Sequence, residues 1–173
     1  NLTCRGCEHY SSISDPFFAD ADQVRRELER LAELFDNIEQ IYLLGGEPLL
    51  HPRVEEFVRV ARHAFPRTRL SLMTNGVLAA RMPESFWVTL DEYDTTLLCD
   101  SYPINLPVDR IEALARDHGV RLEWMKPAEE FFRIPVDVSG SCDAGASFES
   151  CRGLSNCAII RDGHLYPCAH VAY

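Results

Sequence analysis

The feature that most constrains the fold is a regular alternation of short apolar runs with amphipathic segments. Four apolar runs are predicted as strands that end near residues 44, 73, 98 and 124 of the 173-residue chain. These ends recur at roughly 25 to 30 residues, the length of one strand–helix unit. Strands joined by such units lie parallel, with right-handed crossovers. The sequence therefore predicts a parallel sheet or barrel that helices cover.

Three helices are predicted from apolar residues spaced three and four apart. The first, over 20–35, begins at Asp20 or Asp22, either of which can cap it. The second covers 54–65 and stops at Pro66, and the third lies between 107 and 119. Four strand–helix units are too few for an eight-stranded barrel, so an open, partial barrel is predicted. After about residue 126, prolines, glycines and cysteines replace this pattern.

Composition narrows the class of partner. The chain has 17 Lys and Arg against 27 Asp and Glu, a net charge of −10. Nucleic-acid affinity depends on neutralising phosphates, so no nucleic-acid partner is expected. The chain shows no apolar run of membrane-spanning length and no signal-peptide pattern. We therefore expect a protein without a membrane partner, located in the cytoplasm.

The seven cysteines form two groups, with Cys99 alone between them. In a reducing compartment, clustered cysteines are more often metal ligands or redox groups than disulfides. Cys4 and Cys7 precede the first predicted helix, where an earlier strand, before Asn1, would deliver them. A cysteine immediately before Asn1 would complete a C-x-x-x-C-x-x-C loop. Such a loop offers three thiolates to a [4Fe–4S] cluster and leaves one iron open.

The ends of the predicted strands carry residues suited to a ligand site. The first strand runs into Gly45-Gly46-Glu47-Pro48, the second into Thr74-Asn75-Gly76 and the third into Cys99-Asp100-Ser101. Ligands of parallel α/β folds bind at these carboxyl ends. Adjacent glycines allow close approach to the backbone, and Glu47 can pair with an ammonium group. The alternative, that these are plain turns, stays open. Cys99 is interpreted as a buried strand residue.

The C-terminal cysteines are placed by a predicted hairpin. Asp162-Gly163 is a two-residue turn signal that sets Arg161 opposite His164 and Cys157 opposite Cys168. Cys151, in a predicted glycine-containing loop, is a third candidate ligand. A fourth is Cys142, His170, a residue beyond Tyr173 or an open position. A zinc site and a Cys157–Cys168 disulfide remain alternatives, although the cysteine spacing fits zinc poorly.

The chain resembles the radical S-adenosylmethionine (SAM) superfamily. The resemblance rests on Asn1-Leu2-Thr3-Cys4-Arg5-Gly6-Cys7, Gly45-Gly46-Glu47-Pro48 and Thr74-Asn75-Gly76, in family order. The C-terminal part is similar to the twitch or SPASM type of auxiliary iron–sulfur extension. The resemblance implies a partial (β/α) barrel over residues 1–126, lacking its first strand, and a cysteine-rich extension over 127–173.

The resemblance also implies roles for individual residues. Cys4 and Cys7 would hold the SAM-binding [4Fe–4S] cluster, and Gly45 to Pro48 the amino group of SAM. Asn75, Asp100 and Ser101 would contact its ribose or carboxylate. Many members carry an aromatic residue where this chain has Gly6, so Tyr10 is the candidate for the adenine contact. The ligands implied for an auxiliary [4Fe–4S] cluster are Cys151, Cys157 and Cys168.

The function implied is reductive cleavage of SAM to a 5′-deoxyadenosyl radical, which abstracts hydrogen from a small-molecule or peptide substrate. The cofactors supply the chemistry, and the protein supplies position and excludes water. The same resemblance implies oxygen sensitivity and an electron donor such as flavodoxin or ferredoxin. Two alternatives stay open: a non-catalytic iron–sulfur electron-transfer or binding protein on this fold, and a zinc-stabilised structural domain.

Overall fold

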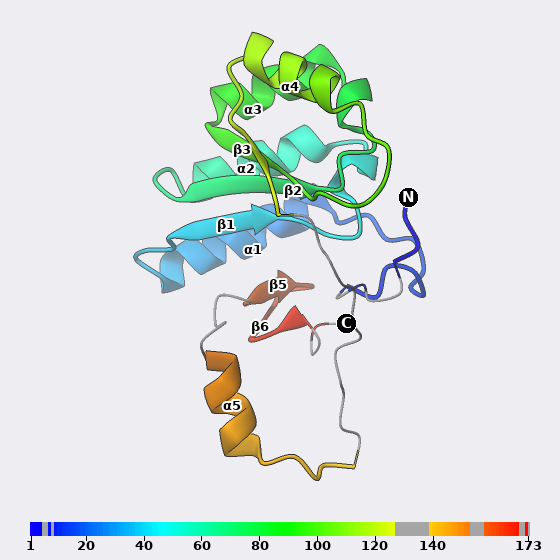
Figure 1. Ribbon diagram of the computed structural model, residues 1–173. Coiled ribbons are helices and arrows are strands. Elements are labelled where there is room, and N and C mark those ends of the chain that lie inside the picture. The colour runs from blue at the N-terminus through cyan, green and yellow to red at the C-terminus, as the bar shows by residue number, and fades with distance from the viewer. Residues whose placement is uncertain (5–6, 8, 127–138, 153–157, 170–171, 173) are drawn as a thin grey trace. The chain divides into compact units, whose positions relative to one another are not determined.

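The computed structural model describes residues 1–4, 7, 9–126, 139–152, 158–169 and 172 (Figure 1). The chain divides into two units. The first unit consists of Asn1 with Pro16–Glu129, and the second of Leu2–Asp15 with Glu130–Tyr173. Each unit is described by itself. The predicted boundary between a core over 1–126 and an extension over 127–173 stays a prediction.

The first unit alternates helices and strands along the chain. Its elements are α1 Ala21–Leu34, β1 Gln40–Leu43, the 3₁₀ helix η1 Pro48–Leu50, α2 Val54–Ala64, β2 Arg69–Thr74, the 3₁₀ helix η2 Ala79–Arg81, α3 Glu84–Glu92, β3 Thr95–Cys99, α4 Val108–Asp117 and β4 Leu122–Trp124. The Asp20 carboxylate accepts a hydrogen bond from the Gln23 N–H and caps α1, as predicted. No helix within the described ranges has the length and apolarity needed to cross a membrane.

The four strands form one parallel sheet in the order β1-β2-β3-β4. Each strand lies beside the next one in the sequence, with Leu43 opposite Leu72, Leu72 opposite Leu97 and Leu97 opposite Leu122. This order confirms the predicted parallel α/β architecture. Because the strands are parallel, the residues that follow β1, β2 and β3 all leave from the same edge of the sheet.

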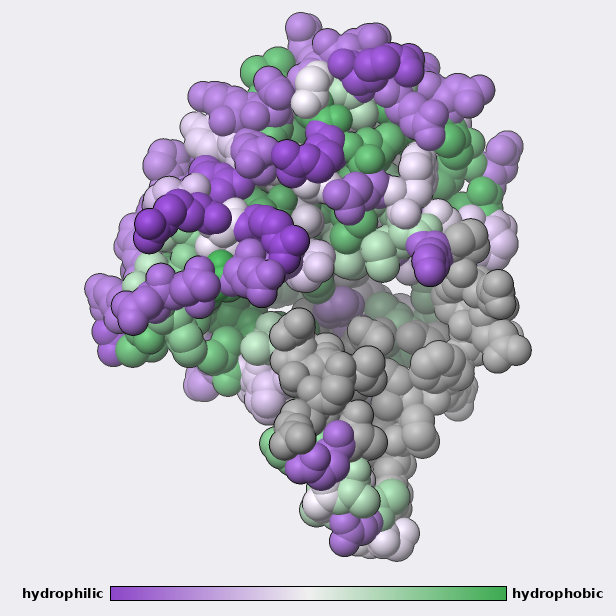
Figure 2. Space-filling model, turned by 60° about the vertical axis from the view of Figure 1, so that its left-hand side comes forward, coloured by the Kyte–Doolittle hydropathy of each residue, from purple (hydrophilic) through white to green (hydrophobic). Residues whose placement is uncertain are grey.

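The core lies between one face of the sheet and the helices. Leu72, Leu97 and Ile111 of α4 are fully buried there. Side chains alternate along a strand, and on the other face Tyr42 and Met125 remain 46% and 43% exposed. Hydrophilic side chains gather on the outer surface at the top of Figure 2, where α3 and α4 lie. The helices of the first unit therefore cover one face of the sheet.

Helix α3 was not predicted. Phe86, Trp87 and Leu90 are completely buried in it, whereas Val88 is 49% exposed. Phe86, Trp87 and Leu90 lie on one helical face, but the apolar Val88 lies on the opposite face and weakens the amphipathic pattern. No side chain caps its start at Pro83. Both signals used to predict a helix are therefore weak in this segment.

The second unit contains the predicted hairpin. Strands β5 Ile159–Arg161 and β6 His164–Tyr166 pair antiparallel, with Ile159 opposite Tyr166 and Arg161 opposite His164. Asp162 and Gly163 both have positive φ, 49° and 77°, as a two-residue turn of this kind requires. The predicted register is therefore confirmed over the described strands. Cys157 lies outside the described residues.

The loop predicted around Cys151 is wrong, because this residue lies in helix α5, Ala144–Arg152. The Asp143 carboxylate accepts a hydrogen bond from the Ala146 N–H at 2.6 Å, and the Asp143 carbonyl accepts one from Ser147. Asp143 therefore acts as the cap of this helix. Glycine disfavours helices by about 1 kcal/mol, but Gly145 lies in the first turn beside this cap.

Candidate functional site

Glu47 connects the turns that follow β1 and β2. It directly precedes η1, and its Oε1 accepts hydrogen bonds from the Leu49 N–H at 3.0 Å and the Thr74 hydroxyl at 2.7 Å. Its Oε2 accepts one from the Asn75 N–H at 3.0 Å. Glu47 is 8% exposed, and no ion pair with it is recorded within the described part of the chain. Neutral donors therefore satisfy this buried carboxylate.

The three bonds leave Glu47 little capacity for a ligand. A carboxylate has about four lone-pair positions, so one acceptor position remains. The predicted pairing of Glu47 with an ammonium group is compatible with this geometry and stays a prediction. The most direct effect of Glu47 is to hold the turn after β1 against the turn after β2.

Asn75 is held on both ends of its side chain. Its Oδ1 accepts a hydrogen bond from the Val77 N–H at 3.0 Å, closing a local turn. Its Nδ2 donates to Asn1 Oδ1 at 2.8 Å. The residue is buried, with 6% of its surface exposed. Asn1, which belongs to the first unit, is thereby attached to the end of β2.

Gly45, after β1, and Gly76, after β2, differ in whether their surroundings require glycine. Gly76 has φ +76°, and a Cβ there would lie 3.2 Å from Leu106 Cδ1, so both conformation and packing favour glycine. Gly45 has no positive φ, and a Cβ there would meet no atom within 4 Å. Nothing in the described surroundings of Gly45 therefore demands glycine. The open space beside it is suited to a ligand that approaches the backbone.

Asp100 and Cys99 lie at the end of β3, next to β2. The Asp100 N–H donates to the Thr74 carbonyl at 2.9 Å. Burial raises the pKa of Asp100, while a hydrogen bond from the Tyr102 hydroxyl opposes this rise. Burial, with the charges of Glu47 and Asp100, raises the pKa of Cys99 to about 12. Cys99 is therefore a protonated, fully buried thiol, as the sequence predicted for a strand residue.

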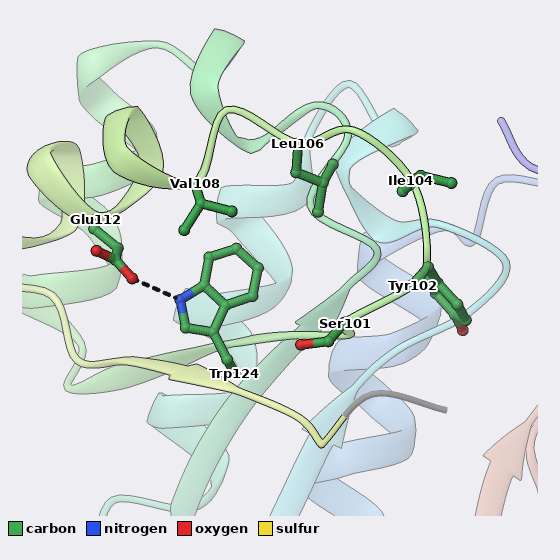
Figure 3. A pocket seen from close by; sticks show the side chains of 7 residues that line it. All are labelled: Ser101, Tyr102, Ile104, Leu106, Val108, Glu112 and Trp124. Atoms are coloured by element: carbon green, nitrogen blue, oxygen red, sulfur yellow. Dashed lines mark hydrogen bonds between the residues drawn. The ribbon is translucent and has the colours of Figure 1, made fainter. Parts of the chain in front are cut away.

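A pocket of about 280 Å³ opens beside the ends of β3 and β4 (Figure 3). Ser101 and Tyr102 line it from the loop after β3, and Trp124 from the end of β4. The Trp124 indole N–H donates to Glu112 Oε1 at 3.2 Å, which fixes the ring at one side of the pocket. Among the predicted contacts, Ser101 thus borders a concave surface large enough for part of a small ligand.

Cys4 and Cys7 lie in the second unit. Both are free, partly buried thiols. The Tyr10 N–H donates to the Cys7 carbonyl at 3.1 Å, and Tyr10 has φ +54°. Free thiols are the side chains that hold iron–sulfur clusters, so the donor chemistry fits. Within the described ranges, no three His, Cys, Asp or Glu side chains group as a metal site.

The auxiliary ligands are described only in part. Cys168 is a free, partly buried thiol just after β6, and Cys142 is free and exposed. Cys151 lies in α5, and the structure does not describe its side chain. Cys157 and His170 lie outside the described residues. The predicted auxiliary site therefore stays a prediction, including its zinc and disulfide alternatives.

The first unit is thus a parallel α/β structure, and the turns at the carboxyl ends of its strands form the candidate ligand site. The profile of the Radical SAM superfamily matches residues 1–106, more than half of the chain. The chain therefore belongs to the radical SAM superfamily. This confirms the resemblance stated for the core; the twitch or SPASM character of the C-terminal part stays a prediction.

Two curated relatives carry the name GTP 3′,8-cyclase. The protein from Streptomyces coelicolor is 28% identical over 171 residues, which is 95% of this chain and 48% of the relative. The protein from Chlorobaculum tepidum is 32% identical over 81 residues, 47% of this chain and 24% of the relative. The matches span about half the length of these relatives or less.

Two solved structures share the fold. BtrN in complex with AdoMet and 2-DOIA has a TM-score of 0.60 and 20% identity, over 96% of this chain and 68% of that one. Native anSMEcpe with bound AdoMet and the Kp18Cys peptide has a TM-score of 0.53 and 19% identity, over 72% of this chain and 39% of that one. At these identities, the likeness concerns the fold.

Thr74 and Asn1 belong to the site but were not predicted as site residues. Both stand in the stretches that carry the family resemblance. Thr74 occupies the last position of β2, and a hydroxyl there can reach the carboxyl-end edge of the sheet. Its position was therefore a usable signal. The partner of Asn1 is 74 residues away, and no local pattern points to it.

Proposed function

We propose that this chain forms the catalytic core of a radical SAM enzyme. The enzyme reductively cleaves SAM at a [4Fe–4S] cluster and abstracts hydrogen from a small-molecule or peptide substrate. The observation that carries the proposal is the family match over residues 1–106, which includes the cysteine loop and both strand-end turns. The contact between those turns through Glu47 supports it.

The chain's own residues would bind and orient the cofactors. Cys4 and Cys7 would ligate iron as thiolates. The open space beside Gly45 would admit the methionine part of SAM to the backbone, and the remaining acceptor position of Glu47 would receive its ammonium group. When bound, the cluster and SAM supply an electron and a carbon-centred radical for hydrogen abstraction.

The residues after β3 would complete the ligand contacts. Ser101 borders the pocket near β4, and Asp100 is attached to the end of β2 by its N–H. These positions support the proposed contacts with the ribose or carboxylate of SAM. Tyr10 is proposed for the adenine because Gly6 stands where many family members carry an aromatic residue, and Tyr10 follows Cys7 by three residues.

The substrate is proposed only by class. A nucleotide is one small-molecule substrate that fits this class, since the names of the two curated relatives refer to GTP. A net charge of −10 argues against a nucleic-acid polymer. We further propose an auxiliary [4Fe–4S] cluster at Cys151, Cys157 and Cys168, an electron donor such as flavodoxin or ferredoxin, oxygen sensitivity and a cytoplasmic location.

Anaerobic reconstitution of the full-length protein with iron and sulfide tests this proposal. We expect about eight irons per chain for two [4Fe–4S] clusters, and 5′-deoxyadenosine that forms only with SAM and a reductant. Cys7→Ala should abolish this product. Cys99→Ala is the matched control, because it removes a buried thiol outside the proposed ligands.

Other outcomes would contradict the proposal in different ways. Iron without 5′-deoxyadenosine would favour the non-catalytic iron–sulfur protein. Zinc in place of iron would favour the structural domain. If Cys7→Ala formed as much 5′-deoxyadenosine as Cys99→Ala, the cysteine loop would not be required for cleavage of SAM.

A further inference from the structure

We propose that the pocket beside Trp124, shown in Figure 3, binds a small molecule that carries a guanidinium group on an aliphatic chain. The inference goes beyond the proposed function, because this binding requires neither an iron–sulfur cluster nor SAM. Of the described residues that line the pocket, Ser101 alone is also a proposed contact to SAM.

The first observation is that the pocket lies on the helix side of the sheet. Trp124 pairs with Cys99 in the register of β3 and β4, and directly paired residues point to the same face. Cys99 is fully buried in the core beneath the helices, and Trp124 packs against the same core. Side chains alternate along a strand, so Glu123 points to the opposite face. Trp124 therefore meets α4 and the loop before it.

The second observation is the fixed orientation of the indole. Trp124 donates its indole N–H to Glu112 Oε1 at 3.2 Å, as the dashed line in Figure 3 shows. This bond uses the single donor of the side chain. What the ring still offers to a ligand is its π surface, and a tryptophan ring attracts cations more strongly than the other aromatic side chains do.

The third observation is the charge of the pocket. Of the seven described residues that line it, Glu112 alone is charged. A carboxylate has about four lone-pair positions, and the Trp124 indole takes one of them. Glu112 can therefore also accept hydrogen bonds from a cation. An anionic ligand would be repelled by this carboxylate and by the net charge of −10.

A guanidinium group matches an indole ring and a carboxylate that are bonded to each other. Its plane stacks on aromatic rings, and its N–H donors lie in that plane and reach a neighbouring carboxylate. An ammonium group is compact and strongly hydrated, so it makes less use of the ring face. The pocket of Trp124 and Glu112 therefore favours guanidinium over ammonium.

The fourth observation is an apolar wall for the chain of the ligand. Leu106 and Val108 line the pocket above the indole in Figure 3, and Ile104 lines it from the loop before α4. Ile104 and Val108 are 38% and 39% exposed, so a ligand there would cover apolar surface. The volume of about 280 Å³ is slightly below the range of about 300–1,000 Å³ for drug-sized ligands, which suits a short alkyl chain.

Titration of the ¹⁵N-labelled full-length protein with butylguanidine, without iron or SAM, tests the inference. The reporter is the NMR signal of the Trp124 indole N–H, which Trp124→Phe identifies. We expect saturable binding with a dissociation constant on the order of 1 mM, as for a ligand of about eight heavy atoms. Trp87 is completely buried in α3, and its indole signal should not move. Butylurea, a neutral molecule of the same shape, and butylamine should each bind about tenfold more weakly.

Two glutamine variants test the role of the carboxylate. Glu112→Gln keeps an acceptor for the Trp124 indole but removes the charge, and should raise the dissociation constant of butylguanidine by about tenfold. Glu123→Gln makes the same change in net charge at an exposed residue on the opposite face, and should change this constant less than about twofold. Backbone NMR spectra establish that all variants are folded.

Several results would overturn the inference. They are the absence of a saturable Trp124 shift, affinity for butylguanidine no higher than for butylurea or butylamine, and equal effects of the two glutamine variants. Displacement of butylguanidine by SAM would also overturn it, because the pocket would then belong to the SAM site. These measurements are made without a cluster, so the proposed function is tested separately by its own reconstitution experiment.

Discussion

At the scale of single residues, a carboxylate as buried as Glu47 needs donors from within the protein. It receives them from two different turns, so its burial also joins those turns. Thr74 is the side-chain donor among them. Its hydroxyl also accepts from the Gly76 N–H, so its removal takes one of the three hydrogen bonds from Glu47 and the recorded partner from the buried Gly76 N–H.

Thr74→Val should lower the free energy of unfolding by about 1–3 kcal/mol, because Glu47 and Gly76 each lose a buried hydrogen bond. Urea denaturation measures the loss. Thr96→Val is the matched control, since its hydroxyl bonds the exposed Arg121, which water can also solvate. Losses of equal size in the two variants would contradict the role given to Thr74.

Asp100 links stability to pH. Burial raises its pKa, so the folded state favours the protonated acid. The associated stability is present below the usual Asp value of 3.8 and is lost as pH rises through the raised value. Asp100→Asn should therefore raise the melting temperature at pH 7 and have little effect below pH 3.8.

Thermal melts from pH 3 to 8 check this expectation. Asp36→Asn, at an exposed position after α1, is the control and should shift the melting temperature little at any pH. A gain for Asp100→Asn that grows toward acid would have the wrong sign and would exclude burial as the cause.

At the scale of elements, Arg62 joins segments that precede two strands. From the last turn of α2, its guanidinium donates to the Thr68 carbonyl at 2.8 Å, just before β2. It also donates to the Tyr93 and Asp94 carbonyls, each at 2.9 Å, just before β3. The guanidinium can do this because its donors are spread over a rigid plane.

Arg62→Lys should lower the free energy of unfolding by about 2–3 kcal/mol, since an ammonium group cannot reach both segments together. Chemical denaturation measures the effect. Arg30→Lys is the control, because Arg30 forms an exposed ion pair with Glu33, and such pairs contribute about 1 kcal/mol or less. A loss for Arg62→Lys no larger than for Arg30→Lys would mean that water replaces the guanidinium.

At the scale of the whole molecule, local sequence patterns predicted most helices and strands, but they did not predict contacts between residues far apart in the sequence. The four strands were found because buried parallel strands are continuous apolar runs. The hairpin was found because Asp162-Gly163 specifies its own turn. Helix α5 was missed because its cap, Asp143, stands among glycines that suggest a loop.

In the candidate site, too, single residues could be predicted from the sequence, whereas contacts between distant residues could not. Gly45, Glu47 and Asn75 were selected because they follow strands, and the fold brings Glu47 and Asn75 into contact. The bond between Asn1 and Asn75 crosses 74 residues. Spacing within the sequence contains no information on such a pair. Only the three-dimensional structure shows this hydrogen bond.

The position of Arg62 has a consequence for how this architecture can diversify. Its contacts secure the amino-terminal edge of the sheet, opposite the turns around Glu47. Insertions and substitutions after the strands can therefore accumulate while the underlying frame persists. Substrate specificity can therefore change through the loops that follow the strands. The same loops can be replaced in protein engineering as long as Arg62 is retained.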